Sequence, residues 1–219
     1  MAVQPIRPLE LMKDENITTS EFTDFIGVWE NFVPASRCQA MIDWFEHVRA
    51  SSALVTDGRP DPTQNDIMDG RGQFKTGSMG RCDESMLLNY SNHDLAYEMN
   101  QYLTACTQHY VDRYSQLKNS KLISEDMKLQ KTMPEGGYHV WHYENAGYGH
   151  HARELVWAIY LNDMPEGEAE TEFFYQRRRI RPSVGTVTIW PASMTHVHKG
   201  NTVFTQDKYI LTGWYIRTP

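Results

Sequence analysis

Long apolar runs, cysteine and basic charge are all scarce in this sequence. No stretch approaches the ~18 consecutive apolar residues that would span a bilayer, and the segment Met1 to Glu10 lacks the apolar run of a signal peptide. The three cysteines, Cys38, Cys82 and Cys106, are widely spaced and odd in number, which is typical of reduced thiols rather than of a disulfide framework. We therefore expect a soluble, cytoplasmic protein with no membrane partner.

Charge and length narrow the class of protein further. Lys and Arg together number 21 against 28 Asp and Glu, which gives a formal net charge of -7. A protein that binds a nucleic-acid backbone needs a basic face, so we expect no nucleic-acid partner. The length of 219 residues suits one domain that buries a core around a cavity. We predict a single domain over residues 1–219, and the sequence leaves its oligomeric state open.

Helical patterns dominate the first part of the chain, to about residue 127. Phe25 to Trp29 reads as a short strand, after which apolar residues recur at helical spacing from Cys38 to Val48 and from Leu95 to Tyr110. Both apolar patterns predict helices that pack on a sheet. Between them, Asp57 to Asp83 carries five glycines and two prolines without sustained periodicity. We predict that this long irregular loop is a lid that closes over a substrate.

The residue pattern is different from about residue 128 to residue 219. Short runs rich in Val, Ile, Thr, Tyr and Trp alternate with turn sequences such as Met164-Pro165-Glu166-Gly167 and Lys199-Gly200-Asn201. This pattern is typical of an antiparallel β-barrel or jelly roll. The predicted fold class is therefore α+β, with N-terminal helices packed on one face of a β-rich part that carries the chemistry.

Histidine is concentrated in the β-rich part, where six of the nine histidines lie between His139 and His198. Side chains on a strand alternate between its faces, so His142 and Glu144 are expected to point the same way and could share one metal ion. A third ligand must come from another strand, and His196 and His198 are the candidates. Two imidazoles and a carboxylate are the ligands of a non-haem Fe(II) centre with open positions, although zinc could bind the same three groups.

A lysine follows the histidine pair along the chain. Lys208 stands ten residues after His198, at the start of a run to Trp214 that reads as a strand. Its ammonium group would point either to solvent or into the barrel, where it would require an anionic partner. A dicarboxylate bound to the metal would supply that anion.

Together these motifs resemble those of a known enzyme family. The residues that carry the likeness are His142-x-Glu144, Tyr160-Leu161-Asn162, Glu170-Thr171-Glu172-Phe173, Pro182-x-x-Gly185, His198 and Lys208. In this combination the chain resembles the 2-oxoglutarate- and Fe(II)-dependent oxygenases, specifically the prolyl 4-hydroxylase branch. The likeness is strongest from Gly136 to Trp214.

The resemblance implies a fold and a ligand set. It implies a double-stranded β-helix core, the jelly-roll fold that cupins share, in which His142, Glu144 and His198 hold iron. It also implies that Lys208, with Tyr160 hydrogen-bonding beside it, binds the far carboxylate of 2-oxoglutarate. The step of ten residues to Lys208 matches the family when it is counted from His198, which favours His198 over its neighbour as the third ligand.

Three further residues receive roles from the same resemblance. Trp214 stands where relatives place a residue that packs near the metal. Arg153 corresponds to an arginine near the substrate mouth in some members. Collagen-type relatives carry a tyrosine where this chain has His139, and we expect Tyr138 to take over that role in binding the co-substrate.

The implied activity is hydroxylation of a peptidyl side chain, with proline as the expected residue and succinate and CO2 as co-products. Fe(II), 2-oxoglutarate and O2 would take part, with ascorbate as a candidate reductant and a proline-containing protein or peptide as the partner. The chain departs from the family at Glu144, because the usual ligand is aspartate, which is one methylene shorter. The same ligands also allow a zinc-dependent hydrolase, a cupin-type isomerase or a non-catalytic β-barrel binding module.

Overall fold

The computed structural model describes residues 19–51, 56–57 and 81–218. Most of the predicted lid, residues 58–80, lies outside the described residues, so the lid remains a prediction. The elements in chain order are β1 (Ser20–Thr23), β2 (Ile26–Trp29), α1 (Ala35–Ser51), β3 (Thr56–Asp57), β4 (Arg81–Cys82), β5 (Glu84–Leu87), α2 (Leu88–Ser91), α3 (His93–Arg113), η2 (Ser115–Leu117), β6 (Lys121–Thr132), β7 (Gly137–Tyr138), β8 (Arg153–Tyr160), β9 (Thr171–Phe173), β10 (Arg178–Ile180), β11 (Val187–Pro191), η3 (Met194–His196), β12 (His198–Gly200) and β13 (Lys208–Thr218).

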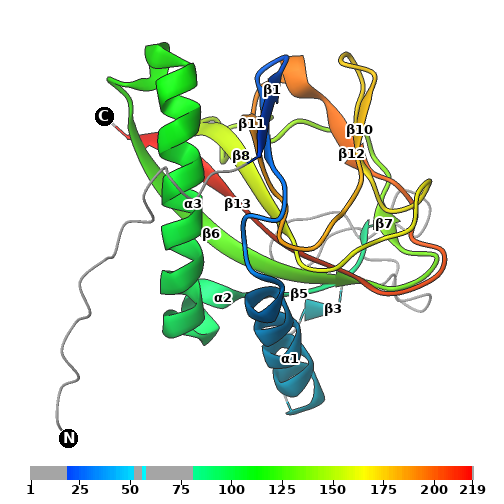
Figure 1. The fold of residues 1–219 in the computed structure, drawn as a ribbon. Coiled ribbons are helices and arrows are strands. Elements are labelled where there is room, and N and C mark those ends of the chain that lie inside the picture. Colours follow the sequence, from blue (N-terminus) through cyan, green and yellow to red (C-terminus); the bar gives the residue numbers. More distant parts are fainter. Residues whose placement is uncertain (1–18, 52–55, 58–80, 219) are drawn as a thin grey trace, which may run out of the picture.

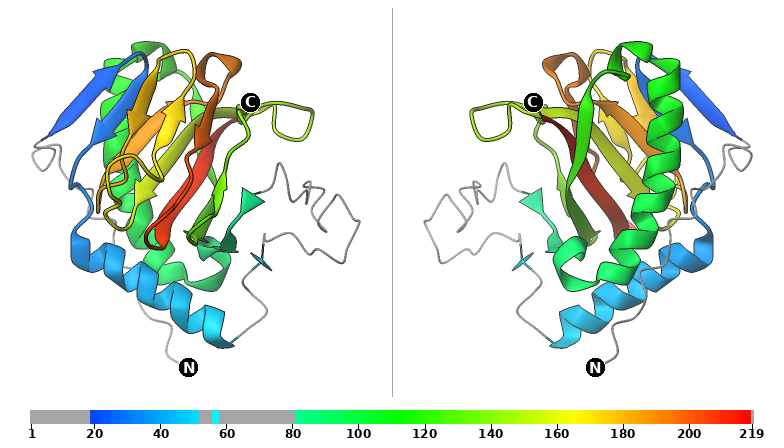
Figure 2. Two further views of the ribbon diagram at one scale, coloured as in Figure 1. Left: turned by 90° about the vertical axis from the view of Figure 1, so that its right-hand side faces the viewer. Right: turned by 90° about the vertical axis from the view of Figure 1, so that its left-hand side faces the viewer.

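Two antiparallel sheets form the framework. The larger sheet has eight strands in the order β1-β2-β11-β8-β13-β6-β5-β3, and a smaller sheet has the order β10-β9-β12. Figure 1 shows α3 on one side of the large sheet and β10 and β12 on the other, and Figure 2 shows the molecule from the side of the small sheet and from the side of α3. This is the predicted α+β architecture, a double-stranded β-helix with helices packed on one outer face.

The central strand β8 shows how the sequence places the layers. Its side chains alternate in direction, as strand geometry requires. The odd-numbered residues from Leu155 to Ile159 pack into the cluster that includes the helices. The even-numbered residues from Val156 to Tyr160 pack instead with Phe173 of β9, on the inner side of the sheet. Because both faces of β8 are buried from Leu155 to Tyr160, that part of the strand is a continuous apolar run without polar alternation.

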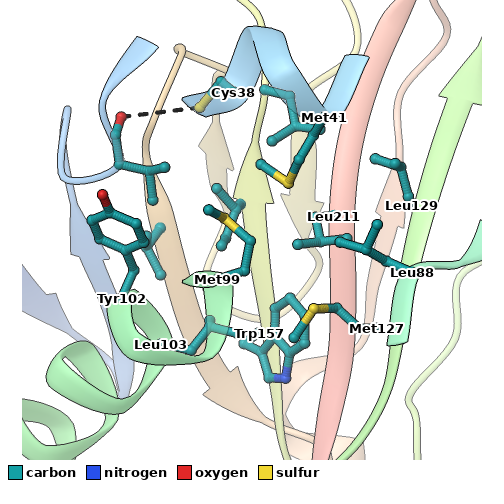
Figure 3. Close-up of a cluster of buried hydrophobic side chains, with 14 of the residues drawn as sticks. Cys38, Met41, Leu88, Met99, Tyr102, Leu103, Met127, Leu129, Trp157 and Leu211 are labelled. Atoms are coloured by element: carbon teal, nitrogen blue, oxygen red, sulfur yellow. Dashed lines mark hydrogen bonds between the residues drawn. The ribbon is translucent and has the colours of Figure 1, made fainter. Parts of the chain in front are cut away.

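The helices cover the outer face of the large sheet with one apolar cluster. Cys38 and Met41 of α1 meet Met99 and Leu103 of α3 above Trp157 of β8 (Figure 3). Helix α3 contains the predicted apolar pattern from Leu95 to Tyr110, and it begins at His93, where the Asn92 side chain caps it by accepting a hydrogen bond from the backbone N–H of Leu95. No helix within the described parts of the chain is both long and apolar enough to cross a membrane.

The predicted division near residue 127 is too simple. Strands β1 and β2 form one edge of the large sheet and β5 lies next to β6 near the other edge, so the N-terminal part supplies strands as well as helices. Strand β6 already begins at Lys121. Strand β2 lies within the segment Phe25 to Trp29 that the sequence predicts as a strand. Strand β5 is not predicted, because four residues are too few to give a period of two that stands out from a helical pattern.

The segment that leads into α1 lies against the sheet at a glycine in the turn before β11. Gly185 has a φ of +75°, and a Cβ atom there would lie 2.0 Å from the carbonyl oxygen of Val33. The backbone N–H of Val33 donates to the carbonyl of Gly185 at 2.9 Å, and the N–H of Gly185 donates to the carbonyl of Tyr160 at 2.8 Å. The absence of a side chain therefore allows a close backbone approach that joins three segments.

We predict that Gly185→Ala lowers the free energy of unfolding by at least about 3 kcal/mol, because alanine adds left-handed backbone strain and a backbone clash. Gly167→Ala is the matched control. Gly167 has a φ of +90°, but a Cβ there meets nothing within 4 Å, so only the strain remains. That control should lose about 1–2 kcal/mol. Urea unfolding measures both variants, and equal losses would contradict the close approach.

Candidate metal centre and cavity

The three predicted ligands come together through a backbone bridge between distant segments. His142 lies after β7 and His198 begins β12, and the two residues form an isolated antiparallel β-bridge. Their backbones exchange hydrogen bonds of 3.0 and 2.9 Å, and the N–H of Glu144 donates to the carbonyl of Ala192 at 2.9 Å. We expected His142 and Glu144 on a regular strand. The structure shows only this bridge, but it still directs both side chains to one place.

The ligand atoms converge closely. One donor atom from each of His142, Glu144 and His198 lies within 4.8 Å of the other two. Oε1 of Glu144 is 3.2 Å from Nε2 of His142 and 3.6 Å from Nε2 of His198. The imidazole rings are tilted against each other with centroids 4.4 Å apart. This grouping fits a facial set of two nitrogens and one oxygen around a single ion.

Backbone carbonyls fix which ring nitrogen faces the centre. Nδ1 of His142 is 2.8 Å from the carbonyl oxygen of Val140, and Nδ1 of His198 is 2.9 Å from that of His196. A carbonyl accepts only, so each Nδ1 carries a proton and Nε2 is the ring nitrogen that faces the centre and can bind a metal. Two ring nitrogens and a carboxylate oxygen that face one point need positive charge between them, and a shared metal ion would supply it.

Burial alone would raise the pKa of Glu144, but the hydrogen bonds and charges of His142 and His198 outweigh it and hold the pKa well below its usual range. The carboxylate is therefore ionised, as a metal ligand must be.

His196, the competing third ligand, is turned away from this point. Its Nε2 is 2.7 Å from the carbonyl oxygen of Asp24, and its Nδ1 is 2.9 Å from the hydroxyl of Thr195. Burial lowers the pKa of His196, so the ring is a neutral structural group that ties η3 to the turn after β1. Both of its nitrogens are engaged, and the choice of His198 from the spacing agrees with the geometry.

One cavity joins this centre to the predicted lysine. It has a volume of about 610 Å³, and its lining includes the His142, Glu144 and His198 group as well as Lys208. Lys208 is only 7% exposed. Its Nζ donates a hydrogen bond of 2.7 Å to the carbonyl oxygen of Ala169. The ammonium therefore points into the barrel, the second of the two possibilities that the sequence left open.

The charge of Lys208 is poorly compensated there. Desolvation lowers the pKa of Lys208 to about 8, although the charges of Glu170 and Asp83 act in the opposite direction. A neutral carbonyl is a weak partner for a buried ammonium, so an anion that enters the cavity would gain a strong interaction.

Tyr160 contacts Thr171, a residue that lines the cavity. The tyrosine is fully buried, and its hydroxyl donates to Oγ1 of Thr171 at 2.7 Å. Its ring centroid lies 5.7 Å from Nζ of Lys208. Thr171 is among the residues that line the cavity and Tyr160 is not, so Thr171 stands between Tyr160 and the place where the sequence expected a hydrogen bond from the tyrosine. Thr171 belongs to the Glu170-to-Phe173 motif that carries the family resemblance, but the sequence alone assigns Thr171 no role.

Tyr138 and Trp214 both line the cavity. The ring of Tyr138 lies against that of His142, with centroids 4.3 Å apart. Trp214 packs against Arg153, whose guanidinium carbon is 3.6 Å from the ring centroid. Both residues are therefore next to the centre, as expected, and their roles toward a cofactor remain predictions.

Arg153 also lines the cavity, but its partners are carboxylates of the protein. Nη1 lies 3.4 Å from Oε2 of Glu144, and Nε lies 3.4 Å from Oε2 of Glu125. The sequence placed this arginine at the substrate mouth and did not predict its contact with a ligand candidate.

A family match covers the part of the chain that holds these groups. The family model described as the 2OG-Fe(II) oxygenase superfamily matches residues 127–216, a segment that contains His142, Glu144, His198 and Lys208. This part of the chain is similar to the 2OG-Fe(II) oxygenase superfamily. The matched segment coincides with the strands around the cavity. The comparison with curated proteins found no match.

Solved structures of prolyl hydroxylases share the fold of the whole described chain. A viral collagen prolyl hydroxylase from Paramecium Bursaria Chlorella virus-1, in its 2OG complex, has a TM-score of 0.62 at 16% identity and covers 90% of this chain and 97% of that one. A prolyl hydroxylase from Trichoplax adhaerens, in complex with a hypoxia inducible factor peptide fragment, has a TM-score of 0.65 at 16% identity, covering 89% and 84%. A Pseudomonas putida prolyl-4-hydroxylase has a TM-score of 0.60 at 15% identity, covering 94% and 97%. These similarities establish the double-stranded β-helix fold.

We predict that His142→Ala and His198→Ala each abolish tight binding of Mn(II), because each removes one of three ligands. His196→Ala should retain the parent affinity while lowering the free energy of unfolding by about 1–3 kcal/mol, since it removes a buried ring together with its hydrogen bonds to Asp24 and Thr195. Isothermal titration calorimetry and urea unfolding separate the two effects. Loss of Mn(II) binding in His196→Ala would show that the ligand assignment is wrong.

Proposed function

We propose that this oxygenase binds Fe(II) through His142, Glu144 and His198 and uses 2-oxoglutarate and O2 to hydroxylate a peptidyl side chain, with proline as the first candidate. The observation that carries the proposal is one cavity that contains both a facial ligand set and a buried lysine whose ammonium, among the described residues, donates to a backbone carbonyl. The superfamily supports Fe(II), 2-oxoglutarate and O2 as the reaction partners.

Different residues would bind the metal and the co-substrate. When bound, iron, 2-oxoglutarate and O2 would supply the oxidising chemistry, in which one oxygen atom of O2 enters succinate with loss of CO2 and the other enters the hydroxylated product. His142, Glu144 and His198 would hold the metal and leave positions for the co-substrates. Lys208 and Thr171 line the cavity and would bind the far carboxylate of 2-oxoglutarate, which fixes the orientation of the co-substrate. The buried walls keep bulk water away from the reacting groups.

A peptide substrate is supported by the surface beside the centre. Trp141 directly precedes His142 and is 37% exposed, and its ring meets the 53% exposed Phe174 edge to face at 5.1 Å. Nζ of Lys199 lies 4.6 Å from the Trp141 ring centroid. Exposed aromatic rings of this kind suit the flat, preformed shape of a proline-containing segment. The peptide complex of the Trichoplax adhaerens neighbour agrees with this substrate class. Ascorbate as the reductant and a cytoplasmic location belong to the same proposal.

The deciding experiment is an anaerobic titration of the protein with Fe(II) and then 2-oxoglutarate, followed by assays in air. A weak visible charge-transfer band on addition of 2-oxoglutarate, Fe(II)-dependent succinate formation and a mass increase of one oxygen in proline-containing peptides are expected. Hydrolysis that needs zinc and no 2-oxoglutarate would establish the hydrolase alternative instead. Failure to bind either metal would leave the binding module.

We predict that Lys208→Met weakens 2-oxoglutarate binding to the metal-loaded protein by about 2 kcal/mol, roughly thirtyfold, because it removes a charge-assisted contact. Metal affinity should not change. Lys199→Met is the control, since Lys199 lines the same cavity but lies over the Trp141 ring. Parent-like 2-oxoglutarate affinity in Lys208→Met would rule out this anion site.

The same lysine predicts a pH dependence. The pKa of Lys208 is lowered to about 8 in the protein without an anion, so the ammonium is present below that pH and is lost above it. Affinity for 2-oxoglutarate should therefore be constant below about pH 7 and fall as the pH rises beyond 8, with proton uptake on binding there. Calorimetry in buffers of different ionisation enthalpy detects that uptake. Lys208→Arg should bind without it, because a guanidinium does not titrate in this range.

Trp141→Ala should raise the KM for a peptide substrate by roughly tenfold, the loss of about 1–1.5 kcal/mol of aromatic contact, and leave metal and 2-oxoglutarate affinity unchanged. Phe25→Ala is the control, because Phe25 is 55% exposed but packs on Tyr114 instead of on any residue of the centre. Steady-state kinetics on both variants make the comparison. Equal effects of the two changes would argue against a peptide surface at Trp141.

A further inference from the structure

The guanidinium of Arg153 is held from three elements around the candidate metal centre. Its side chain is 10% exposed. Nη1 meets Oε2 of Glu144 after β7, Nε meets Oε2 of Glu125 on β6, and the guanidinium carbon lies 3.6 Å above the ring of Trp214 on β13. A planar cation that stacks on an aromatic ring and pairs with two carboxylates has little freedom to turn toward a substrate.

The two oxygens of Glu144 consequently face different groups. Oε1 points at Nε2 of both His142 and His198, at 3.2 and 3.6 Å, whereas Oε2 points at Arg153 at 3.4 Å. A glutamate is longer and more flexible than the aspartate that usually fills this position in the resembled family, and a carboxylate can bind a metal through one oxygen or through both. Binding through both oxygens would fill a coordination position that the co-substrate needs.

We propose that Arg153 is a positioning residue that engages Oε2 of Glu144, so that this glutamate coordinates through Oε1 alone and the centre keeps its free positions. This inference rests on the proposed function. It replaces the substrate-mouth role that the sequence suggested for Arg153. Trp214 acts with it by fixing the plane of the guanidinium, which gives that cavity residue a role in the protein itself.

The test uses Co(II), whose visible absorption reports coordination number, as a substitute for iron. In Arg153→Gln the freed Oε2 enters the coordination sphere, so the Co(II) spectrum should change and the affinity of the Co(II)-loaded protein for 2-oxoglutarate should fall at least about tenfold. Arg217→Gln is the matched control, because Arg217 lies on β13 and pairs with Glu154 at 2.9 Å, which is not a ligand candidate. Its spectrum and 2-oxoglutarate affinity should equal those of the parent.

The same substitution in a Glu144→Asp protein separates an effect on the position of the carboxylate from a general effect on the structure. Glu144→Asp withdraws the carboxylate by one methylene from Arg153, so Arg153→Gln added to Glu144→Asp should change 2-oxoglutarate affinity by less than about twofold. If Arg153→Gln does not fold, Trp214→Leu should show a smaller change in the same direction, since it removes only the stacking surface.

The outcomes are distinct. A parent protein that binds no Co(II) would refute the proposed function itself. A parent that binds Co(II) while Arg153→Gln keeps the same spectrum and 2-oxoglutarate affinity would overturn the inference alone, and a change confined to the peptide KM would return Arg153 to the substrate mouth. An equal tenfold loss in the Glu144→Asp background would also overturn it.

Discussion

The backbone bridge between His142 and His198 is the constraint on which the site depends. It joins the segment after β7 to the start of β12, and these strands lie far apart in the chain. Each histidine then uses a carbonyl close to itself to fix its proton on Nδ1 and to present Nε2. The position and the chemical form of both nitrogen ligands are therefore set by main-chain groups, which cannot rotate away as side chains can. The large sheet and the helices that cover it keep those main-chain segments in place.

The electrostatics of the cavity follow from this arrangement. Glu144 brings a negative charge among groups that need a cation, and Lys208 brings a desolvated positive charge that needs an anion. A metal with a chelating dicarboxylate would satisfy both needs at once, with the metal at one group and the far carboxylate at the other. Arg153, Trp214 and Thr171 line the walls of the cavity. The charge of Arg153 is paired with Glu144 and Glu125, and the other two residues are uncharged, so none of them favours a further ion in the cavity.

Much of this could be predicted from the sequence, because the relevant signals are local or periodic. The apolar patterns of α1 and α3, the alternation that puts His142 and Glu144 together and the spacing from His198 to Lys208 each depend on a few neighbouring residues. Thr171 and Arg153 are different. Their roles depend on contacts with Tyr160 and Glu144 that only the folded arrangement of strands creates. Strand β2 falls within the strand that the sequence predicts from Phe25 to Trp29, whereas β5 is not predicted, because its four residues carry too little pattern. The lid predicted between Asp57 and Asp83 lies mostly outside the described residues.

The most direct test of the central claim is a crystal structure with Mn(II) and 2-oxoglutarate, with the metal located by its anomalous scattering. The account predicts one peak within about 2.0–2.3 Å of Nε2 of His142, Nε2 of His198 and Oε1 of Glu144, bonds of the length that such ligands make. It also predicts a 2-oxoglutarate carboxylate at hydrogen-bond distance from Nζ of Lys208. A peak bound through Nδ1 or by His196, or a co-substrate carboxylate remote from Lys208, would contradict it.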